Sequence, residues 1–188
     1  MNKKILIVGG VAGGATALAR LRRLDQHATI ILFERGEYVS FANCGLPYYV
    51  GETITPREKL LVSSVEKLET QYGVDVRIQS EVTKINRETK SVDVKNLVTG
   101  EVYQESYDTL LLSPGSSPLV FPFPGVDGKN VFTLTTLNDA DKIYNFIKDN
   151  KVKKALVVGG GFIGLELVEN LVHRKIEVTL VEKMNQVM

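Results

Sequence analysis

Two glycine-rich turns, one early and one late in the chain, contain the residues whose spacing points most clearly to chemistry. The later turn reads Gly159-Gly160-Gly161-Phe162-Ile163-Gly164, which fits G-x-G-x-x-G between a predicted strand and a predicted helix. In this pattern the first glycine permits a tight bend, the second lets the backbone approach a pyrophosphate, and the third lets the helix pack closely on the strand. The turn therefore predicts a dinucleotide site, with a plain glycine turn as the alternative.

Glu182 ends the strand that follows this turn, where a carboxylate can accept a hydrogen bond from an adenosine ribose hydroxyl. A negative charge there would repel a 2′-phosphate, so we expect NADH to be preferred over NADPH. The neighbouring Lys183 weakens this preference and leaves NADPH open. Glu166, on the helix after the turn, is a candidate for orienting the nicotinamide, with a solvated helix face as the alternative.

The earlier turn departs from the pattern at one position. It reads Gly9-Gly10-Val11-Ala12-Gly13-Gly14, so Val11 occupies the place of the middle glycine. Glu34 ends the next predicted strand, as Glu182 does in the later copy. This turn alone is only suggestive, but the repeated arrangement predicts sites for two different dinucleotides.

Cys44 is the only cysteine, so it cannot form an internal disulfide, and a single cysteine fits a reducing compartment. If a helix begins near Cys44, its amides would stabilise a thiolate, the form that attacks disulfides. The sulfur would then cycle through a mixed disulfide with an external thiol, or through a sulfenic acid. A small buried hydrophobe is the common alternative for a lone cysteine.

The helix predicted after the first turn carries Thr16, Arg20 and Arg23 at i, i+4 and i+7, so they share one stripe. Two guanidinium groups on such a stripe could grip the phosphates of a nucleotide-bearing thiol. A solvated basic helix face explains the same spacing equally well.

The elements that position these residues form a duplicated βαβ pattern. Continuous apolar runs predict buried strands, and apolar residues at helical spacing predict the helices between them. The first copy has strands at residues 4–8 and 29–33 around a helix at 15–24, and the second has strands at 155–158 and 178–181 around a helix at 163–172.

The segment between the two copies carries the remaining predicted elements. We predict a helix capped by Ser64 that reaches about Tyr72, and a helix capped by Asn138 that reaches Lys148. Strands are predicted at residues 74–78, 82–86, 91–94 and 110–112, and residues 40–50 are predicted to be irregular.

The string Ser40-Phe41-Ala42-Asn43-Cys44-Gly45-Leu46-Pro47-Tyr48-Tyr49 resembles the single-cysteine branch of the pyridine nucleotide-disulfide oxidoreductases. Within that branch it is most similar to coenzyme A-disulfide reductases and NADH-dependent persulfide reductases, and the resemblance runs from Ile5 to the end of the chain. It implies FAD on the first turn with Glu34 at the ribose, NAD(P)H on the second turn, and Cys44 as the redox centre beside the flavin. Residues 107–116 resemble the segment where such chains leave the flavin domain.

The resemblance completes the set of predicted site residues. It implies a coenzyme A site that uses the first helix, with Ser40 and Asn43 near the sulfur. The residues predicted to bind substrate are Thr16, Arg20, Arg23, Ser40 and Asn43. Those predicted to bind the cofactors are Gly9, Gly10, Val11, Ala12, Gly13, Gly14, Glu34, Arg35, Asn43, Pro114, Gly115, Gly159, Gly161, Phe162, Ile163, Gly164, Glu166 and Glu182.

The predicted fold is α/β: a Rossmann-like FAD/NAD(P)-binding fold whose parallel sheet carries an antiparallel β-meander, with two dinucleotide-binding units. We place the FAD-binding domain at residues 1–118 and the start of the NAD(P)-binding domain at 119–188. A dinucleotide domain needs about four or five parallel strands, so we expect the second unit to be incomplete and the chain to be part of a longer protein. The resemblance implies that the full protein is a homodimer and that this piece alone is inactive, with its retention of FAD left open.

The predicted reaction is NADH-dependent reduction of coenzyme A disulfide, or of a coenzyme A or small-molecule persulfide, through FAD and Cys44. The alternatives are an NADH oxidase or peroxidase that uses a cysteine sulfenate, and a non-catalytic dinucleotide-binding module. A net charge of +1 and the absence of an apolar run of about 18 residues argue against nucleic-acid and membrane partners. We expect a cytoplasmic protein without a metal site, since His27 and His173 lie far apart.

Overall fold

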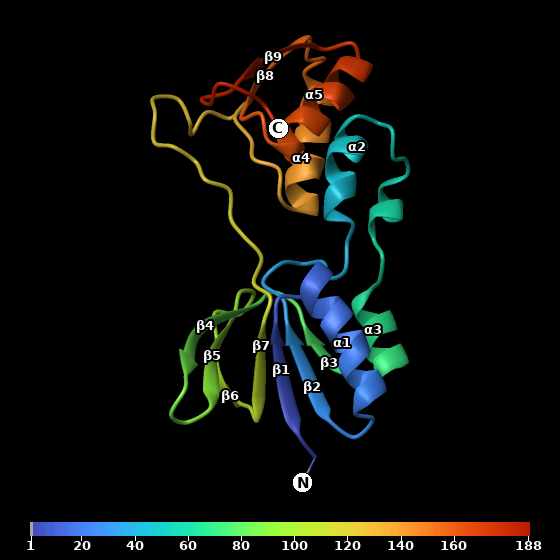
Figure 1. The fold of residues 1–188 in the computed structure, drawn as a ribbon, viewed down its shortest axis with the longest axis vertical. Helices are drawn as coiled ribbons and strands as arrows, with labels where there is room; N and C mark the ends of the chain where they lie inside the picture. Colours follow the sequence, from blue (N-terminus) through green and yellow to red (C-terminus); the bar gives the residue numbers. More distant parts are fainter. Residues whose placement is uncertain (1) are drawn as a thin grey trace. The chain divides into compact units, whose positions relative to one another are not determined.

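A computed structural model of the chain describes residues 2–188. The chain forms two compact units, which are described separately (Figure 1). The first unit contains the residues up to Phe41 together with Leu61–Ser116, and the second contains Ala42–Leu60 together with Ser117–Met188. The chain therefore passes between the units after Phe41, after Leu60 and after Ser116.

A four-stranded parallel sheet forms the centre of the first unit, in the order β3-β2-β1-β7. The strands are β1 (Lys4–Val8), β2 (Thr29–Phe33), β3 (Asp75–Arg77) and β7 (Thr109–Leu112). Neighbouring strands pair in register, for example Lys4 with Thr29 and Ile5 with Thr109. The two central strands, β1 and β2, are buried along most of their length, in keeping with their continuous apolar runs.

The two faces of this sheet contact different layers. Helices α1 (Ala12–Leu24) and α3 (Val65–Tyr72) lie on one face, where Ile5 and Ile7 of β1 pack with Leu18 and Leu68 (Figure 1). Leu6 points to the opposite face and packs with buried residues of the antiparallel insertion. Successive side chains of a strand point to opposite faces, so one short strand serves both cores.

The antiparallel insertion is a three-stranded meander of β4 (Ser80–Asn86), β5 (Ser91–Asn96) and β6 (Val102–Ser106). Strand β6 was not predicted, because its residues alternate between exposed and half-buried and include Gln, Glu and Ser. The predicted α/β fold, with a parallel sheet and an antiparallel meander, is confirmed.

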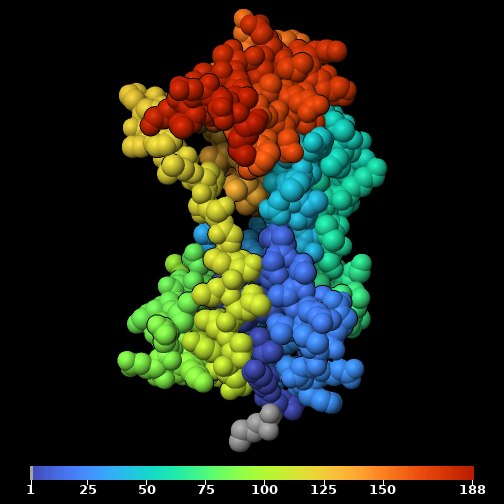
Figure 2. All heavy atoms as spheres, in the orientation of Figure 1, coloured from blue at the N-terminus to red at the C-terminus, as the bar shows by residue number. Residues whose placement is uncertain are grey.

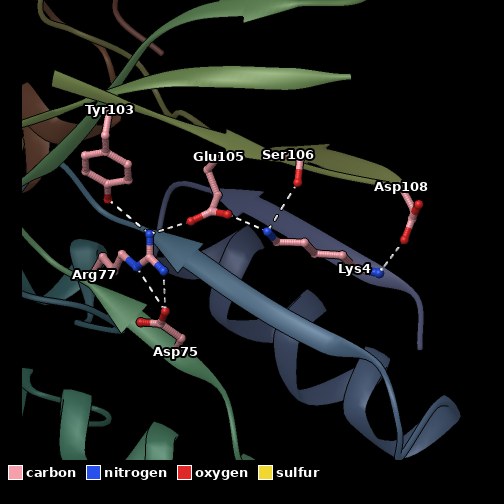
Figure 3. Close-up of polar contacts among 7 residues, drawn as sticks. All are labelled: Lys4, Asp75, Arg77, Tyr103, Glu105, Ser106 and Asp108. Atoms are coloured by element: carbon pink, nitrogen blue, oxygen red, sulfur yellow. Dashed lines mark hydrogen bonds and ion pairs between the residues drawn. The ribbon is translucent and has the colours of Figure 1, made fainter. Parts of the chain in front are cut away.

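A polar network joins the meander to the parallel sheet (Figure 3). Arg77 of β3 donates to Glu105 at 2.7 Å and to the Tyr103 hydroxyl at 3.2 Å, and it also pairs with Asp75. The Lys4 ammonium contacts the other oxygen of Glu105. The side chain of Glu105 is only 16% exposed, so two cations from the sheet hold a largely buried carboxylate of the meander.

The second unit has a two-stranded parallel sheet of β8 (Lys154–Val158) and β9 (Glu177–Val181), with helices α4 (Leu137–Asp149) and α5 (Phe162–His173). The separate segment 42–60 belongs to this unit and contains the 3₁₀ turns Asn43–Gly45 and Arg57–Leu60 around helix α2 (Leu46–Val50). Helix α2 packs against α4 and α5, and Figure 2 shows the cyan atoms of this segment beside the orange and red atoms of the unit. The prediction of an irregular segment at residues 40–50 is therefore wrong over α2.

Of the two predicted N-terminal helix caps, the one on α3 is confirmed and the one on α4 is wrong. Ser64 caps α3 as predicted, accepting a hydrogen bond from the Lys67 amide at 3.1 Å. The cap of α4 is Thr136 and not Asn138. The Thr136 hydroxyl accepts from the Asp139 amide while the Asp139 carboxylate accepts from the Thr136 amide, which satisfies two helix-end donors at once.

Candidate functional site

The first glycine turn lies where the C-terminal ends of β1, β2 and β7 meet. Gly9 has a φ of +97° and donates its amide hydrogen to the Phe33 carbonyl at 2.8 Å. A Cβ atom added at Gly9 would lie 1.9 Å from the Ser113 carbonyl oxygen, and one at Gly14 would lie 1.7 Å from the Gly9 oxygen. No side chain of residues 2–188 caps α1, so the amides of its first turn have no side-chain partner there.

The second turn repeats this geometry. Gly159 has a φ of +107° and donates its amide hydrogen to the Val181 carbonyl at 2.8 Å. A Cβ atom at Gly164 would lie 2.0 Å from the Gly159 oxygen, whereas one at Gly161 would meet nothing closer than the Met188 sulfur at 4.0 Å. Gly161 therefore leaves open space in front of the first turn of α5.

The two acids also occupy equivalent positions. Glu34 accepts from the Gly10 amide at 2.7 Å and from the Gly36 amide at 2.6 Å. Glu182 accepts from the Gly160 amide at 2.6 Å and from the Met184 amide at 2.7 Å.

These hydrogen bonds favour the ionised form of Glu182 and orient its carboxylate. The amide of Gly160, followed by that of Met184, lowers the pKa of Glu182 below its ordinary value. Each carboxylate oxygen still has a second acceptor position after its amide contact. Both turns therefore fit a dinucleotide whose phosphates face the helix amides and whose ribose hydroxyls reach the acid.

Cys44 lies in the 3₁₀ turn directly before α2, and its thiol is exposed. The alternative of a small buried hydrophobe is therefore wrong. The neighbouring Gly45 is buried, and a Cβ atom there would lie 2.6 Å from the Leu60 side chain. The backbone on one side of the cysteine is packed while the sulfur is open to solvent.

Side chains of α4 hold the segment that carries Cys44. The Asp141 carboxylate accepts from Arg57 Nε, which is 2.9 Å from both oxygens, from Arg57 Nη2 at 2.7 Å, and from the Tyr49 hydroxyl at 3.0 Å. Burial, followed by the hydrogen bond to Asp141, raises the pKa of Tyr49 to about 12. The Tyr49 ring stacks on Tyr144 with 5.1 Å between ring centroids.

A second set of contacts comes from α5 and its C-terminal end. Arg174 donates to the Val50 carbonyl at 2.8 Å and pairs with Glu52 at 2.9 Å. Thr53 donates to the Asn170 amide oxygen at 3.2 Å. The cysteine segment is thus fixed within the second unit from both of the unit's long helices.

A groove of about 590 Å³ lies in the first unit, between α1, α3 and the backbone that flanks Phe41 and Val62. Its lining residues are Val11, Ala12, Ala15, Thr16, Ala19, Arg23, Ser40, Phe41, Val62, Ser63, Lys67, Leu68, Gln71 and Tyr72. Three of the predicted substrate residues line it, namely Thr16, Arg23 and Ser40. Arg20 is exposed and does not line it, and Asn43 belongs to the second unit.

The other residues proposed for cofactor binding lie at or near the two turns. Arg35 follows Glu34 and forms an exposed ion pair with Glu81 at 3.8 Å. Pro114 and Gly115 follow β7, and Gly115 has a φ of +70°. Phe162 and Ile163 are exposed in the first turn of α5, and Glu166 is half-buried one turn later.

The described residues contain neither a cluster suited to a metal ion nor a helix suited to a membrane. Within residues 2–188, no set of three or more His, Cys, Asp or Glu side chains is placed to bind a metal ion. No helix in the same range has both the length and the apolar character needed to cross a bilayer.

Two turns of this geometry, each with an acid at the end of the following strand, are typical of proteins that bind dinucleotides, and comparison with known families agrees. The family model described as pyridine nucleotide-disulphide oxidoreductase matches residues 3–188. The chain belongs to this family.

Relatives within the family share much of the sequence. The chain is 44% identical to the coenzyme A disulfide reductase of Staphylococcus aureus over 184 residues. This alignment covers 98% of the chain and 41% of the relative, so the chain spans less than half the length of the curated relatives it matches.

Solved structures of related proteins are similar in fold. The reduced CoADR-RHD of Bacillus anthracis has a TM-score of 0.97 and 55% identity, covering 100% of this chain and 34% of that one. An NAD-dependent persulfide reductase from A. fulgidus has a TM-score of 0.93 and 35% identity, and the match covers 98% of this chain and 34% of that one. A water-forming NADH oxidase from Lactobacillus brevis, bound to NADH, has a TM-score of 0.92 and 31% identity, and the match covers 100% of this chain and 41% of that one.

Proposed function

We propose that this chain provides the cofactor-binding turns and the redox cysteine of an FAD-dependent NAD(P)H:disulfide oxidoreductase. The substrate is coenzyme A disulfide, or a persulfide of coenzyme A or of another small thiol. The observation that carries the proposal is the exposed Cys44 thiol in a chain with two copies of the same dinucleotide-binding geometry. The parent protein acts in the cytoplasm as a homodimer.

In this proposal the two turns have different ligands. The first turn and Glu34 hold FAD, and the second turn and Glu182 hold NADH. Gly161 leaves the second turn open to a pyrophosphate, whereas Val11 stands at the same place in the first. FAD, when bound, passes electrons from the nicotinamide to sulfur.

Cys44 reacts with the substrate disulfide. Its thiolate attacks one sulfur of coenzyme A disulfide, the S–S bond breaks, and one coenzyme A thiolate leaves. The enzyme keeps a Cys44–coenzyme A mixed disulfide, which two electrons from NADH reduce to two thiols. The groove of the first unit supports this substrate class, because its cations suit the phosphates of coenzyme A.

The mixed disulfide gives a direct test. The reduced chain is mixed with coenzyme A disulfide, quenched with acid, and analysed by intact mass and peptide mapping. We expect one coenzyme A per chain, attached at Cys44, with release of one free coenzyme A. Cys44→Ser should form no adduct.

A different outcome would favour the oxidase or peroxidase alternative. If the chain forms no adduct with coenzyme A disulfide but hydrogen peroxide converts Cys44 to a sulfenic acid that dimedone traps, the sulfenate chemistry is correct. If neither reagent modifies Cys44 in this chain or in the full-length parent protein with FAD bound, the catalytic proposal is wrong and the protein is a dinucleotide-binding module.

A further inference from the structure

Helix α5 connects the second glycine turn to the segment that carries Cys44. The helix begins directly after Gly161, in the turn that fits a dinucleotide, and ends at His173. It also packs against α2, which begins two residues after Cys44 (Figure 1). At a rise of about 1.5 Å per residue, a helix of 12 residues is about 18 Å long. One rigid element therefore contacts both features.

Asn170 makes the polar contact between α5 and the cysteine segment. Its side chain is only 3% exposed, which is unusual for an asparagine. The amide nitrogen donates to the Glu166 carbonyl at 2.8 Å, and the amide oxygen accepts from the Thr53 hydroxyl at 3.2 Å. The donor of this side chain is thus used within α5, and the acceptor is used toward the cysteine segment.

Gly51 lets the backbone of the cysteine segment lie directly against Asn170. A Cβ atom added at Gly51 would lie 2.3 Å from the Asn170 amide oxygen and 2.5 Å from the Asn170 Cβ atom. The φ of Gly51 is −77°, which any residue can adopt. The close contact, and not the backbone conformation, therefore requires glycine at this position.

The residue after Gly51 has an unfavourable backbone conformation, and a residue at the end of α5 binds its side chain. Glu52 has a φ of +62°, in the left-handed region that costs free energy for residues other than glycine. The Glu52 carboxylate pairs with Arg174 at 2.9 Å, and Arg174 also donates to the Val50 carbonyl at 2.8 Å. The C-terminal end of α2 therefore depends on contacts with the C-terminal end of α5.

Helix α2 needs such contacts because it is short. A helix of five residues is not stable on its own in water, so packing keeps α2 ordered. Segments that depend on a few tertiary contacts open locally at a lower free energy than the rest of the fold. A change in the order of α5 should therefore change how often residues 46–54 open.

We infer that Asn170 is a positioning residue that links occupancy of the second glycine turn to the order of the cysteine segment. The inference rests on the proposed function, because it takes NADH or NAD⁺ as the ligand of that turn. Helix α5 is restrained when its first amides donate to a pyrophosphate, and the Asn170 contacts pass this restraint to Gly51 and Thr53. The surroundings of Cys44 are then best ordered when the coenzyme is bound.

Amide hydrogen exchange of the full-length parent protein with FAD bound tests the inference. The probe is NAD⁺, which has the adenosine and pyrophosphate of NADH and delivers no electrons to the flavin or to sulfur. We expect saturating NAD⁺ to slow exchange in residues 46–54 about fivefold. Asn170→Leu keeps a similar side-chain volume without the amide, so in this variant the effect of NAD⁺ should fall below about twofold.

The affinity for NAD⁺ gives a second readout, because coupling between two sites is reciprocal. Asn170→Leu should weaken NAD⁺ binding by about the factor that is lost from the exchange effect, roughly threefold to fivefold, measured by calorimetry. A purely structural role of Asn170 predicts a different result. Exchange in residues 46–54 would then quicken equally with and without NAD⁺, and the affinity would not change.

Two further variants complete the experiment. Asn145→Leu makes the same change at an exposed position of α4 in the same unit and should leave both readouts as in the natural protein. Thr53→Val removes the hydroxyl that donates to Asn170 and leaves α5 intact, so it provides the test if Asn170→Leu does not fold. In Thr53→Val we expect the effect of NAD⁺ on exchange to fall to about twofold to threefold.

The inference and the proposed function fail in different ways. If NAD⁺ binds but leaves exchange of residues 46–54 unchanged, or protects them equally in Asn170→Leu, the inference is wrong and the proposed function stands. Protection that Asn170→Leu abolishes, together with no coenzyme A adduct at Cys44, upholds the inference and overturns the disulfide chemistry. If NAD⁺ does not bind to the parent protein, the assignment of the second turn is wrong and the inference falls with it.

Discussion

The glycines of the two turns serve different physical roles, although all belong to one motif. At Gly14 and Gly164 an added Cβ atom would overlap a backbone oxygen of the same turn, so folding requires glycine there. At Gly161 the space is open and the backbone is extended, so folding does not require glycine. We therefore propose that the middle glycine serves a ligand that approaches the backbone.

Two alanine substitutions in the second turn separate these roles. Gly164→Ala should destabilise the chain by about 1–3 kcal/mol or more, because the Cβ atom overlaps the Gly159 oxygen. Gly161→Ala should change stability by less than about 1 kcal/mol and still weaken NADH binding. Urea unfolding and fluorescence titration with NADH measure the two effects. Equal losses of stability in both variants would contradict the distinction.

The charge at the end of β9 should control the choice of coenzyme. Glu182→Gln removes the negative charge that would face a 2′-phosphate, so the affinity for NADPH relative to NADH should rise about fivefold. Glu177→Gln, at the exposed start of the same strand, is the matched control. Titration of both variants with each coenzyme gives the ratio, and an unchanged ratio would remove Glu182 from this role.

Among the elements, the meander depends on charged contacts for its attachment to the sheet (Figure 3). Burial raises the pKa of Glu105, but hydrogen bonds from Lys4 and Arg77 outweigh it and hold the pKa below its ordinary value. The ionised carboxylate is thus favoured in the folded chain. Its loss would leave two half-buried cations without their shared partner.

This arrangement predicts how stability depends on pH. The folded-state pKa of Glu105 lies below the unfolded value of about 4.3, so its contribution is fully present above that pH. It is lost as the pH falls through the lower, folded-state pKa. Glu105→Gln should cost about 1–3 kcal/mol at neutral pH and should flatten the acid limb of the stability curve. Glu81→Gln, in an exposed pair, should cost less than about 0.5 kcal/mol, and equal costs would contradict the prediction.

The elements that local sequence predicts well are those with a strong pattern of their own. The apolar runs at residues 4–8 and 29–33 match β1 and β2 in full, and the glycine turns and their acids were found because each motif is contiguous. Helix α2 has only five residues and a proline in its first turn, and its packing against α4 and α5 stabilises it. Its existence therefore depends on residues that come much later in the chain.

The same limit applies to the candidate site. Thr16 and Arg23 could be grouped because they lie on one helix, but nothing local connects them to Lys67. These residues line one groove only because α1 and α3 lie on the same face of the sheet, which the tertiary fold alone determines. The single-helix pair of arginines was the best grouping that spacing alone could offer.

At the scale of the whole molecule, the main feature that the sequence does not reveal is that residues 42–60 belong to the second unit. This segment leaves the first unit after Phe41 and returns to it at Leu61, yet it packs within the second unit. The predicted domains at 1–118 and 119–188 divide the chain by cofactor, and that division remains a proposal.

Removing one anchor should loosen the cysteine segment selectively. In Arg174→Ala the Val50 carbonyl and the Glu52 carboxylate lose their partner. We expect amide hydrogen exchange in residues 46–54 to quicken about tenfold, while β1 and β2 of the first unit keep their protection. Glu169→Ala, an exposed position on α5, is the control. Faster exchange across the whole chain would show that the segment has no separate anchorage.

The distance in sequence between the cysteine segment and its anchors also affects how the protein is made. Tyr49 precedes Asp141 by 92 residues, and Thr53 precedes Asn170 by 117. A ribosome that adds 5–20 residues per second needs roughly 6–23 s to synthesise the longer stretch. During that interval Cys44 has been synthesised, but helices α4 and α5, which hold its segment in the folded chain, have not yet been completed. The segment that carries Cys44 therefore reaches its folded surroundings only after α4 and α5 have been made.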